Sequence, residues 1–390
     1  MQTLSCFAAP FRRSGGKGLP RRQYDFTLQQ LPPGMLATRS STGTGFLNES
    51  VQTFPANTAR FTGHIPPALL LEPQSTNLIT HSASIGGTDW SSGNGVTVTQ
   101  NYGVAPDGTQ TSTRIVGTGT NNGRVLQVVS GLTDGDVATG SVWIKGTGTP
   151  RLQFQEDGGS WAVYWTEDVT PTSDWVRYEI SATMGTDGNA KRFLISGIGG
   201  DTDIEIWGAQ IEKNVEWATS YIPTTSNQAT RTADEVTLND LSWLDKDVFW
   251  FYATIIPTKA PVNGQFPPFV KFKGASDDDR IELFCSGYSN KIALRVDSGD
   301  ALQVDANANM PDIVLGQTYK AAVAVQKNNF RVCVDGSTIV KDTNGSMPQS
   351  LETLQIGAAD YANKKTAFLI TELVIINGTP TDAEMQAMTQ

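Results

Sequence analysis

Short runs of alternating or apolar residues, each closed by Gly, Asp, Asn or Pro, recur about every ten residues from Trp90 onward. This rhythm constrains the fold strongly, because each run has the length of a strand and is too short for a helix. The 38 glycines and the charged fraction of 17% suit many tight turns better than helical packing. Strands at this spacing are typical of antiparallel sandwiches. The sequence therefore predicts an all-β fold.

The strand-like runs form two series, separated near residue 228 by the linker TTSNQA. A chain of 390 residues is long enough for two domains. We predict two antiparallel, jelly-roll-like β-sandwiches, one in residues 23–227 and one in residues 228–390. A helix is expected only near the end, where Thr381 and Glu384 of PTDAEMQAM form a capping-box pattern.

The stretch WGAQIEKNVEWATSYIPTT (207–225) closes the first series and is rich in aromatic residues. Apolar residues on both faces of its strand favour a buried position over a sugar platform. We expect Trp217 and Tyr221 to pack the chain back onto the sandwich. The stretch is thus predicted to clasp the two domains together.

Residues 1–22 form a basic segment in front of an acidic body. The segment has no acidic residue, and the basic and aromatic side chains proposed to act in it are Phe7, Phe11, Arg12, Arg13, Lys17, Arg21 and Arg22. Its charge favours docking on an acidic protein surface, and a solvated tail is the alternative. We predict an anchoring segment at 1–22.

Charge and composition argue against several classes of function. The net charge of −10 argues against nucleic acid as the main partner, because phosphate binding relies on Lys and Arg. No apolar run is long enough to insert into a membrane. With two His and no paired cysteines, a zinc site is not expected. Cys285 and Cys333 are expected to be free and buried in strands, and a disulfide between them is the alternative.

Two tryptophans are the candidate glycan-binding residues. Trp161 and Trp165 are four positions apart, so in one strand both would lie on the same face, with Tyr164 on the other. Glu156 and Asp157 lie close by in sequence and could bind sugar hydroxyls. Ordinary core packing of the two tryptophans is the alternative interpretation.

An acidic loop is the candidate metal site. Asp277, Asp278 and Asp279 supply consecutive carboxylates, and calcium prefers oxygen ligands. Consecutive carboxylates cannot all face one ion, so a solvated acidic loop stays open as the alternative. No other cofactor is expected.

Several segments resemble the sandwich domains of tailed-bacteriophage fibres and head fibres. These are TRSSTGTGFLNESVQTFPANTARF (38–61), LLLEPQSTNLI (69–79), GVAPDGTQTSTRIV (103–116) and WGAQIEKNVEWATSYIPTTSNQATRTADEV (207–236), which occur in the order of that family. Residues 237–390 resemble a concanavalin or laminin-G type jelly roll. That likeness rests on VAVQKNNFRVCVDGS and on the terminal ITELVIINGTPTDAEMQAM.

The resemblance implies a virion surface protein that is assembled in the host cytoplasm. It implies a homo-oligomer, with a trimer expected, that docks on other virion proteins through its N-terminal segment. The first sandwich would be similar to a carbohydrate-binding module, and its partners would be host-surface glycans. The expected function is a fibre or spike, on tail or capsid, that attaches the particle to its host.

Two other functions stay open at this point. One is a capsid decoration or adaptor protein that makes only protein contacts. The other is a glycan-degrading tailspike enzyme, which would need paired carboxylates. Glu156, Asp157, Glu167 and Asp168 are available, but no spacing distinguishes an acid from a nucleophile. We therefore expect no enzyme.

Overall fold

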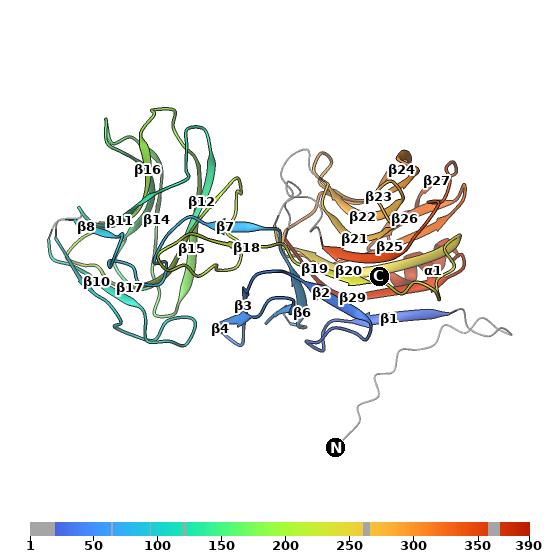
Figure 1. Ribbon diagram of the computed structural model, residues 1–390, viewed down its shortest axis with the longest axis horizontal. Helices are drawn as coiled ribbons and strands as arrows, with labels where there is room; N and C mark the ends of the chain where they lie inside the picture. The colour runs from blue at the N-terminus through green and yellow to red at the C-terminus, as the bar shows by residue number, and fades with distance from the viewer. Residues whose placement is uncertain (1–19, 64, 94, 120–121, 260–265, 358–366) are drawn as a thin grey trace, which may run out of the picture.

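The computed structural model describes residues 20–63, 65–93, 95–119, 122–259, 266–357 and 367–390. Within these residues the chain consists of antiparallel strands and a single short helix. The strands build two sandwiches that lie side by side (Figure 1). The predicted all-β fold of two antiparallel sandwiches is confirmed.

The first sandwich pairs two five-stranded sheets. One sheet contains, in spatial order, β15 (Val176–Thr183), β12 (Val137–Thr147), β17 (Asp203–Lys213), β10 (Thr113–Gly117) and β9 (Val96–Thr99). The other contains β14 (Val163–Asp168), β13 (Arg151–Asp157), β16 (Ala190–Ile198), β11 (Gly123–Val129) and β8 (Ser91–Gly93). In β13 every second residue is buried, and Leu152 and Phe154 point into the core between the sheets.

The second sandwich has an eight-stranded and a seven-stranded sheet. The larger sheet contains β27 (Val340–Asp342), β26 (Phe330–Val334), β25 (Tyr319–Gln326), β20 (Val248–Pro257), β29 (Phe368–Asn377), β6 (Ala68–Leu71) and β5 (Arg60–Thr62), with β1 (Arg21–Asp25) also on β29. The smaller one contains β2 (Met35–Thr38), β19 (Glu235–Leu238), β28 (Thr353–Gly357), β21 (Pro268–Lys273), β22 (Arg280–Ser286), β23 (Lys291–Ser298) and β24 (Ala301–Asn307). A large apolar core fills the space between them.

The helix α1 (Asp382–Met388) packs on the outer side of the larger sheet. Its predicted capping box is confirmed, because the Thr381 side chain accepts from the Glu384 amide and the Glu384 carboxylate accepts from the Thr381 amide. Met385 is its buried residue and joins an apolar cluster with Trp250. Within the described residues, no helix is long and apolar enough to cross a membrane.

The division of the chain differs from the expected boundaries of 23–227 and 228–390. Strands β1, β2, β5 and β6 belong to the sheets of the second sandwich, although they precede the first one in sequence. On one side of β29, β6 pairs with its first residues and β1 pairs with residues 372–376. Only about the middle of the chain, from β8 to β17, forms the first sandwich.

The structure places part of the predicted N-terminal anchoring segment and the two strand cysteines. Arg21 and Arg22, expected in the anchoring segment, lie in β1, and the Arg22 guanidinium stands 4.6 Å from the Trp243 ring centroid. The anchoring residues Phe7, Phe11, Arg12, Arg13 and Lys17 lie outside the described residues. Cys285 and Cys333 are free and buried, as expected.

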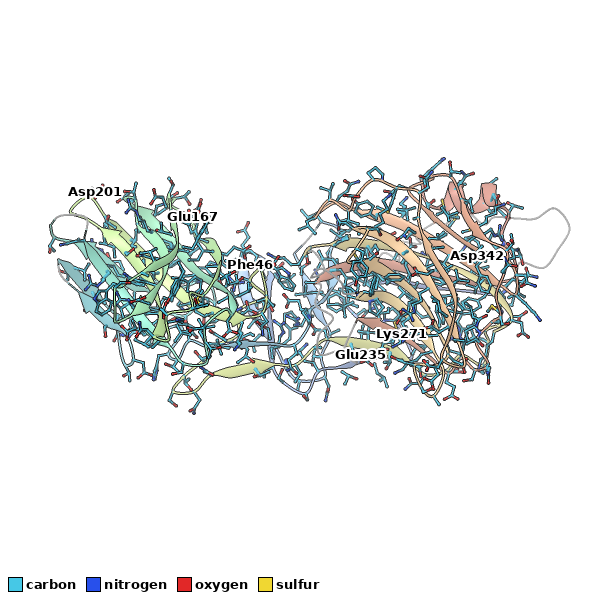
Figure 2. All side chains as sticks on the ribbon, turned by 90° about the horizontal axis from the view of Figure 1, so that it is seen from above. Phe46, Glu167, Asp201, Glu235, Lys271 and Asp342 are labelled. Atoms are coloured by element: carbon cyan, nitrogen blue, oxygen red, sulfur yellow. The ribbon has the colours of Figure 1, made fainter. Side chains whose placement is uncertain are left out.

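An aromatic cluster helps to join the two sandwiches. Trp207 of β17 packs against Tyr221 with ring centroids 4.7 Å apart, and Trp143 of β12 contacts both. Val51 covers the cluster from the hairpin of β3 (Gly43–Leu47) and β4 (Ser50–Phe54). The hairpin carries Phe46 in the space between the sandwiches (Figure 2).

Trp217 adds a second contact between the sandwiches. Its side chain is buried, and Lys259 of the second sandwich lies 5.7 Å from its ring centroid. Lys259 also reaches Glu179 of β15 across the junction, at 3.3 Å. Trp217 therefore contacts the second sandwich, and Tyr221 packs back onto the first sandwich, as expected.

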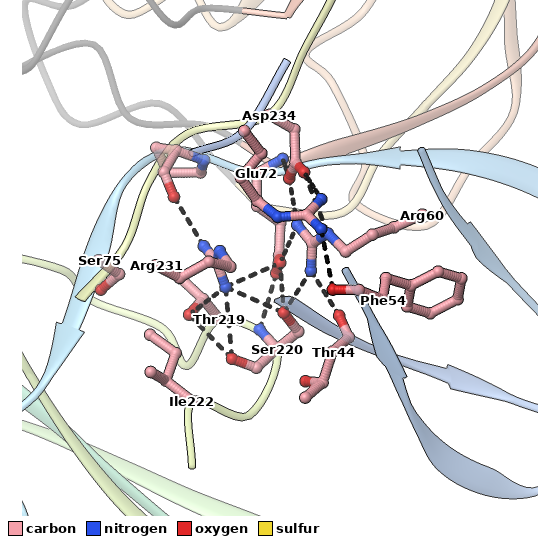
Figure 3. Close-up of polar contacts among 12 residues, drawn as sticks. Thr44, Phe54, Arg60, Glu72, Ser75, Thr219, Ser220, Ile222, Arg231 and Asp234 are labelled. Carbon is pink, nitrogen blue, oxygen red and sulfur yellow. Dashed lines mark hydrogen bonds and ion pairs between the residues drawn. The ribbon is translucent and has the colours of Figure 1, made fainter. Parts of the chain in front are cut away.

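A buried charge network forms the centre of the junction (Figure 3). Arg60 bridges Glu72 and Asp234, and Arg231 also pairs with Glu72, at 3.0 Å. All four side chains are at most 7% exposed. The strand pair of β7 (Ser75–Asn77) and β18 (Ala229–Arg231) runs through the junction beside them. Residues from the segments 38–61, 69–79 and 207–236 therefore supply this junction.

Candidate functional site

The loop between β13 and β14 holds the indole of Trp161 toward solvent. Gly158 and Gly159 turn the chain with positive φ, and Trp161 itself has φ of +60°. The Trp161 amide donates to the Gly158 carbonyl and to the Glu156 carboxylate, both at 2.9 Å. The Gln155 side chain donates to the Trp161 carbonyl at 2.6 Å. These bonds fix the backbone of a non-glycine residue in a conformation that it rarely adopts.

Arg192 of β16 supports one face of this indole. Its guanidinium carbon lies 4.3 Å from the Trp161 ring centroid, and its Nη2 donates to Gln155 at 2.5 Å. Burial lowers the pKa of Arg192, although the nearby Asp157 opposes that effect. Trp161 stays 49% exposed. The ring is thus held in place and remains accessible.

In this structure the predicted glycan-binding carboxylates, Glu156 and Asp157, bind groups of the Trp161 loop and Arg192. Glu156 is 2% exposed, and its Oε1 accepts from the Trp161 amide and the Ser160 hydroxyl. Asp157 pairs with Arg192 at 3.4 Å. Both carboxylates therefore position the residues around the indole.

Trp165 lies in β14, the edge strand of its sheet, and is 51% exposed. It does not share a strand face with Trp161, because Trp161 precedes β14 and the pairing of β13 with β14 shifts register between Phe154 and Gln155. Tyr164 packs against the core as expected, and its hydroxyl donates to Asp187. The two tryptophans are exposed individually and do not form the predicted strand-face pair.

The three carboxylates of the acidic loop have separate partners. Asp277 pairs with Lys271 at 2.6 Å, Asp278 accepts from the Ser276 hydroxyl, and Asp279 accepts from two backbone amides. Among the described residues, no group of three or more His, Cys, Asp or Glu side chains is placed to hold a metal ion. The structure does not bring the predicted calcium ligands together.

A polar cavity of about 310 Å3, which the sequence did not predict, lies on the other sheet of the first sandwich. Its lining includes Tyr102, Arg114, Lys145, Ser173, Asp203 and Glu205. These residues come from strands β10, β12 and β17 and from two loops, so no local motif could reveal it. The alternation of Asp203 and Glu205 along β17 was the one available signal, because it places both on one face.

Comparison with protein-family models and with curated proteins gave no match. The chain is distantly similar to solved β-sandwich domains. Domain 4 of AbnA, a GH43 extracellular arabinanase from Geobacillus stearothermophilus, in complex with arabinotriose, is 18% identical, with 45% of this chain and 84% of that chain covered and a TM-score of 0.34.

Two further structures belong to other classes of protein. The botulinum neurotoxin type G receptor binding domain is 11% identical, with 39% of this chain and 38% of that chain covered and a TM-score of 0.30. The enzymatically active domain of bacteriophage CBA120 tailspike protein 4 is 15% identical, with 35% and 21% covered and a TM-score of 0.29. This chain therefore spans well under half of either protein. At these scores the likeness carries no argument about ligand or activity.

Proposed function

We propose that this protein is a non-enzymatic virion protein, a fibre or spike, that attaches a bacteriophage particle to glycans on its host. The observation that carries the glycan-binding part is the Trp161 indole, half exposed and held by Glu156, Gln155 and Arg192. Single exposed aromatic residues are common on protein surfaces, so the fixed position of the ring, and not its exposure alone, supports the proposal.

The fixed indole suits a sugar because a pyranose presents a flat C–H surface to an aromatic ring and hydroxyls to polar groups around it. A ring that is already ordered loses little conformational entropy when the ligand binds. Gln155, Asp157 and Arg192 surround the ring with hydrogen-bonding groups. Trp165, also half exposed on the neighbouring edge strand, would extend this surface.

The virion role rests on the sequence resemblance of residues 24–236 to phage fibre sandwiches. The quoted segments contribute Arg60, Glu72, Arg231 and Asp234, which form the junction of the two sandwiches. In this proposal the junction fixes the orientation of the glycan-binding sandwich relative to the rest of the protein. The N-terminal segment would dock on the particle, and the protein would act as a trimer.

Binding without hydrolysis is favoured by the state of the carboxylates near the indole. A glycosidase needs a carboxylic acid with a raised pKa beside a second carboxylate. Glu156 is buried and hydrogen-bonded to its own loop, and Asp168 pairs with Arg151 at 2.6 Å. Both carboxylates are therefore engaged with neighbouring groups of the protein.

A protein-only adaptor is the second candidate. Phe46 at the tip of the β3–β4 hairpin is 53% exposed, and Ile65 is 91% exposed. Apolar side chains displayed in this way fit contacts with other virion proteins. Such contacts could coexist with glycan binding, so the two functions are separated by the glycan experiment below.

The test is a glycan array probed with the wild-type protein, with Trp161→Ala and with Tyr288→Ala. Tyr288 is a matched control, because it is an aromatic residue 76% exposed on the second sandwich. We expect wild type and Tyr288→Ala to bind the same glycans, and Trp161→Ala to lose at least about tenfold in affinity. No binding by folded wild-type protein, or equal binding by all three proteins, would contradict the proposal. Release of reducing sugar from a bound glycan would favour the enzyme instead.

A further inference from the structure

The polar cavity lies on the outer face of the sheet that contains β10, β12 and β17, on the opposite side of the first sandwich from the Trp161 sheet. Its volume of about 310 Å3 falls at the lower end of the range of small-molecule sites. Its lining combines an aromatic ring, two cations and two carboxylates in one place. No step of the proposed function uses it.

A row of charged side chains forms the floor of the cavity. The strand register places Glu205 of β17 between Arg114 of β10 and Lys145 of β12. Lys145 Nζ lies 3.2 Å from one Glu205 oxygen, and the other oxygen accepts from the Ser112 hydroxyl at 2.6 Å. Asp203, two residues before Glu205 in β17, accepts two hydrogen bonds from Arg114, at 2.8 and 2.5 Å.

Each of the two cations also contacts an aromatic ring. The Arg114 guanidinium lies 4.9 Å from the Tyr102 ring centroid, and Lys145 Nζ lies 4.8 Å from that of Trp175. The Trp175 indole donates to the Val104 carbonyl at 3.1 Å, which fixes the ring. Tyr102 is 45% exposed and leaves much of its ring available. Tyr102 with Arg114, and Trp175 with Lys145, therefore form two ordered pairs of ring and cation.

Two glycines allow the chain beside the cavity to approach β17 closely. A Cβ atom on Gly103 would lie 2.4 Å from a Glu205 carboxylate oxygen. A Cβ atom on Gly146, which has φ of +128°, would lie 2.2 Å from the Asp203 carbonyl oxygen. At both positions glycine lets the backbone approach the charged floor closely. A larger residue at position 103 would push the Glu205 carboxylate aside, and one at position 146 would collide with the backbone of β17.

We propose that this cavity is a second carbohydrate site, which takes a neutral sugar unit. Tyr102 offers an apolar ring, while Arg114, Lys145 and the two carboxylates offer both donors and acceptors for hydroxyls. The charges balance as two cations and two carboxylates, so an acidic sugar gains no net attraction and meets Asp203 and Glu205. The inference shares its ligand class with the proposed function but uses different residues, so either can fail alone.

Hydrolysis at this site is not part of the proposal. The hydrogen bond from Arg114 lowers the pKa of Asp203 and keeps its carboxyl group ionised, which is unsuited to a general acid. Glu205 is held by the Lys145 ammonium and the Ser112 hydroxyl. Both carboxylates are therefore assigned to accept hydrogen bonds from the ligand.

The experiment titrates the full-length protein with a panel of neutral monosaccharides and disaccharides, together with glucuronic acid and sialic acid, and follows binding by ligand-observed NMR. The variants are Tyr102→Ala and Glu205→Gln, with Tyr288→Ala on the second sandwich as the matched control and Trp161→Ala as the variant that reports on the proposed function. Thermal unfolding verifies that each variant is folded, and Tyr102 is exposed enough to be truncated without loss of the fold.

We expect at least one neutral sugar to bind wild type and Tyr288→Ala equally, and at least about tenfold more weakly to Tyr102→Ala. Glu205→Gln should weaken the same sugar at least about threefold. Equal binding to the cavity variants, preference for the acidic sugars, or absence of neutral-sugar binding would overturn the inference. If only Trp161→Ala loses affinity, this inference fails and the proposed function stands. If no sugar binds at all, both fail.

Discussion

The molecule uses the same chemistry in two places, a buried charge network at the junction and an open one in the cavity of the first sandwich. At the junction Arg60, Glu72 and Asp234 are almost completely buried. In the cavity the Asp203 side chain is 47% exposed and that of Arg114 is 34% exposed. The buried network can stabilise the fold but is closed to a ligand, whereas the exposed network is accessible to one.

The electrostatics follow this difference. Burial alone would raise the pKa of Glu72, but Arg231 and Arg60 outweigh it and lower that pKa to about 2. Charges sealed in this way are costly to leave without a partner. A half-exposed pair such as Arg114 and Asp203 is screened by water and contributes little to stability. Replacing a carboxylate with alanine should therefore destabilise the fold strongly at the junction and only slightly in the cavity.

The largest effect is expected for Glu72→Ala at the junction. The substitution leaves Arg231 and Arg60 buried without their shared carboxylate and removes two hydrogen bonds to Ser220. We expect the free energy of unfolding to fall by about 3–5 kcal/mol, measured by urea denaturation. A loss below about 1 kcal/mol would show that the junction charges do not hold the fold.

Acid should weaken the junction through the same carboxylate. Its pKa is lowered from 4.5 to about 2, so its contribution is fully present above pH 4.5 and is lost as the pH falls through 2. The contribution is on the order of 3 kcal/mol. Denaturant unfolding of wild type and Glu72→Gln between pH 5 and pH 2 measures it. Identical pH profiles for the two proteins would contradict this assignment.

A moderate effect is expected for Arg192→Ala beneath the Trp161 indole. The substitution removes the guanidinium on the ring and its bonds to Gln155, so the indole becomes less ordered. Glycan affinity should fall about threefold to fivefold, which corresponds to a cation–π contact of about 0.5–1 kcal/mol. Titration of a glycan that binds wild type measures it, and an unchanged affinity would show that Arg192 has no part in positioning the ring.

The smallest effect on stability is expected for Asp203→Ala in the cavity. The Arg114 partner stays partly in water, so the free energy of unfolding should change by less than about 1 kcal/mol. Parallel urea denaturation with Glu72→Ala supplies the comparison. A loss as large as that at the junction would remove the distinction between the two networks.

Local sequence patterns predicted the parts of the fold that depend on neighbours in the chain. The strand rhythm, the helix with its Thr381–Glu384 capping box and the packing of Tyr221 all follow from nearby residues. The assignment of strands β1, β2, β5 and β6 to the second sandwich could not be predicted, because pairing such as Arg21 with Ile376 joins distant segments. Hydrophobic alternation is the same in either sandwich.

The candidate sites show the same limit. The sequence singled out Trp161 as an aromatic candidate, but strand alternation placed it on one face with Trp165, and its positive φ and the shifted register break that relation. The cavity depends on Tyr102 meeting Arg114 and Trp175 meeting Lys145 across separate segments. Only the folded chain shows those contacts.

The most direct test of glycan binding at the open surfaces is NMR of the indole N–H signals of the nine tryptophans during titration with a glycan that binds the wild-type protein. We expect the bound glycan to shift the signal of Trp161, of Trp175, or of both, while that of Trp207, buried in the junction cluster, does not shift. Saturable glycan binding that leaves Trp161 and Trp175 unmoved would contradict this expectation.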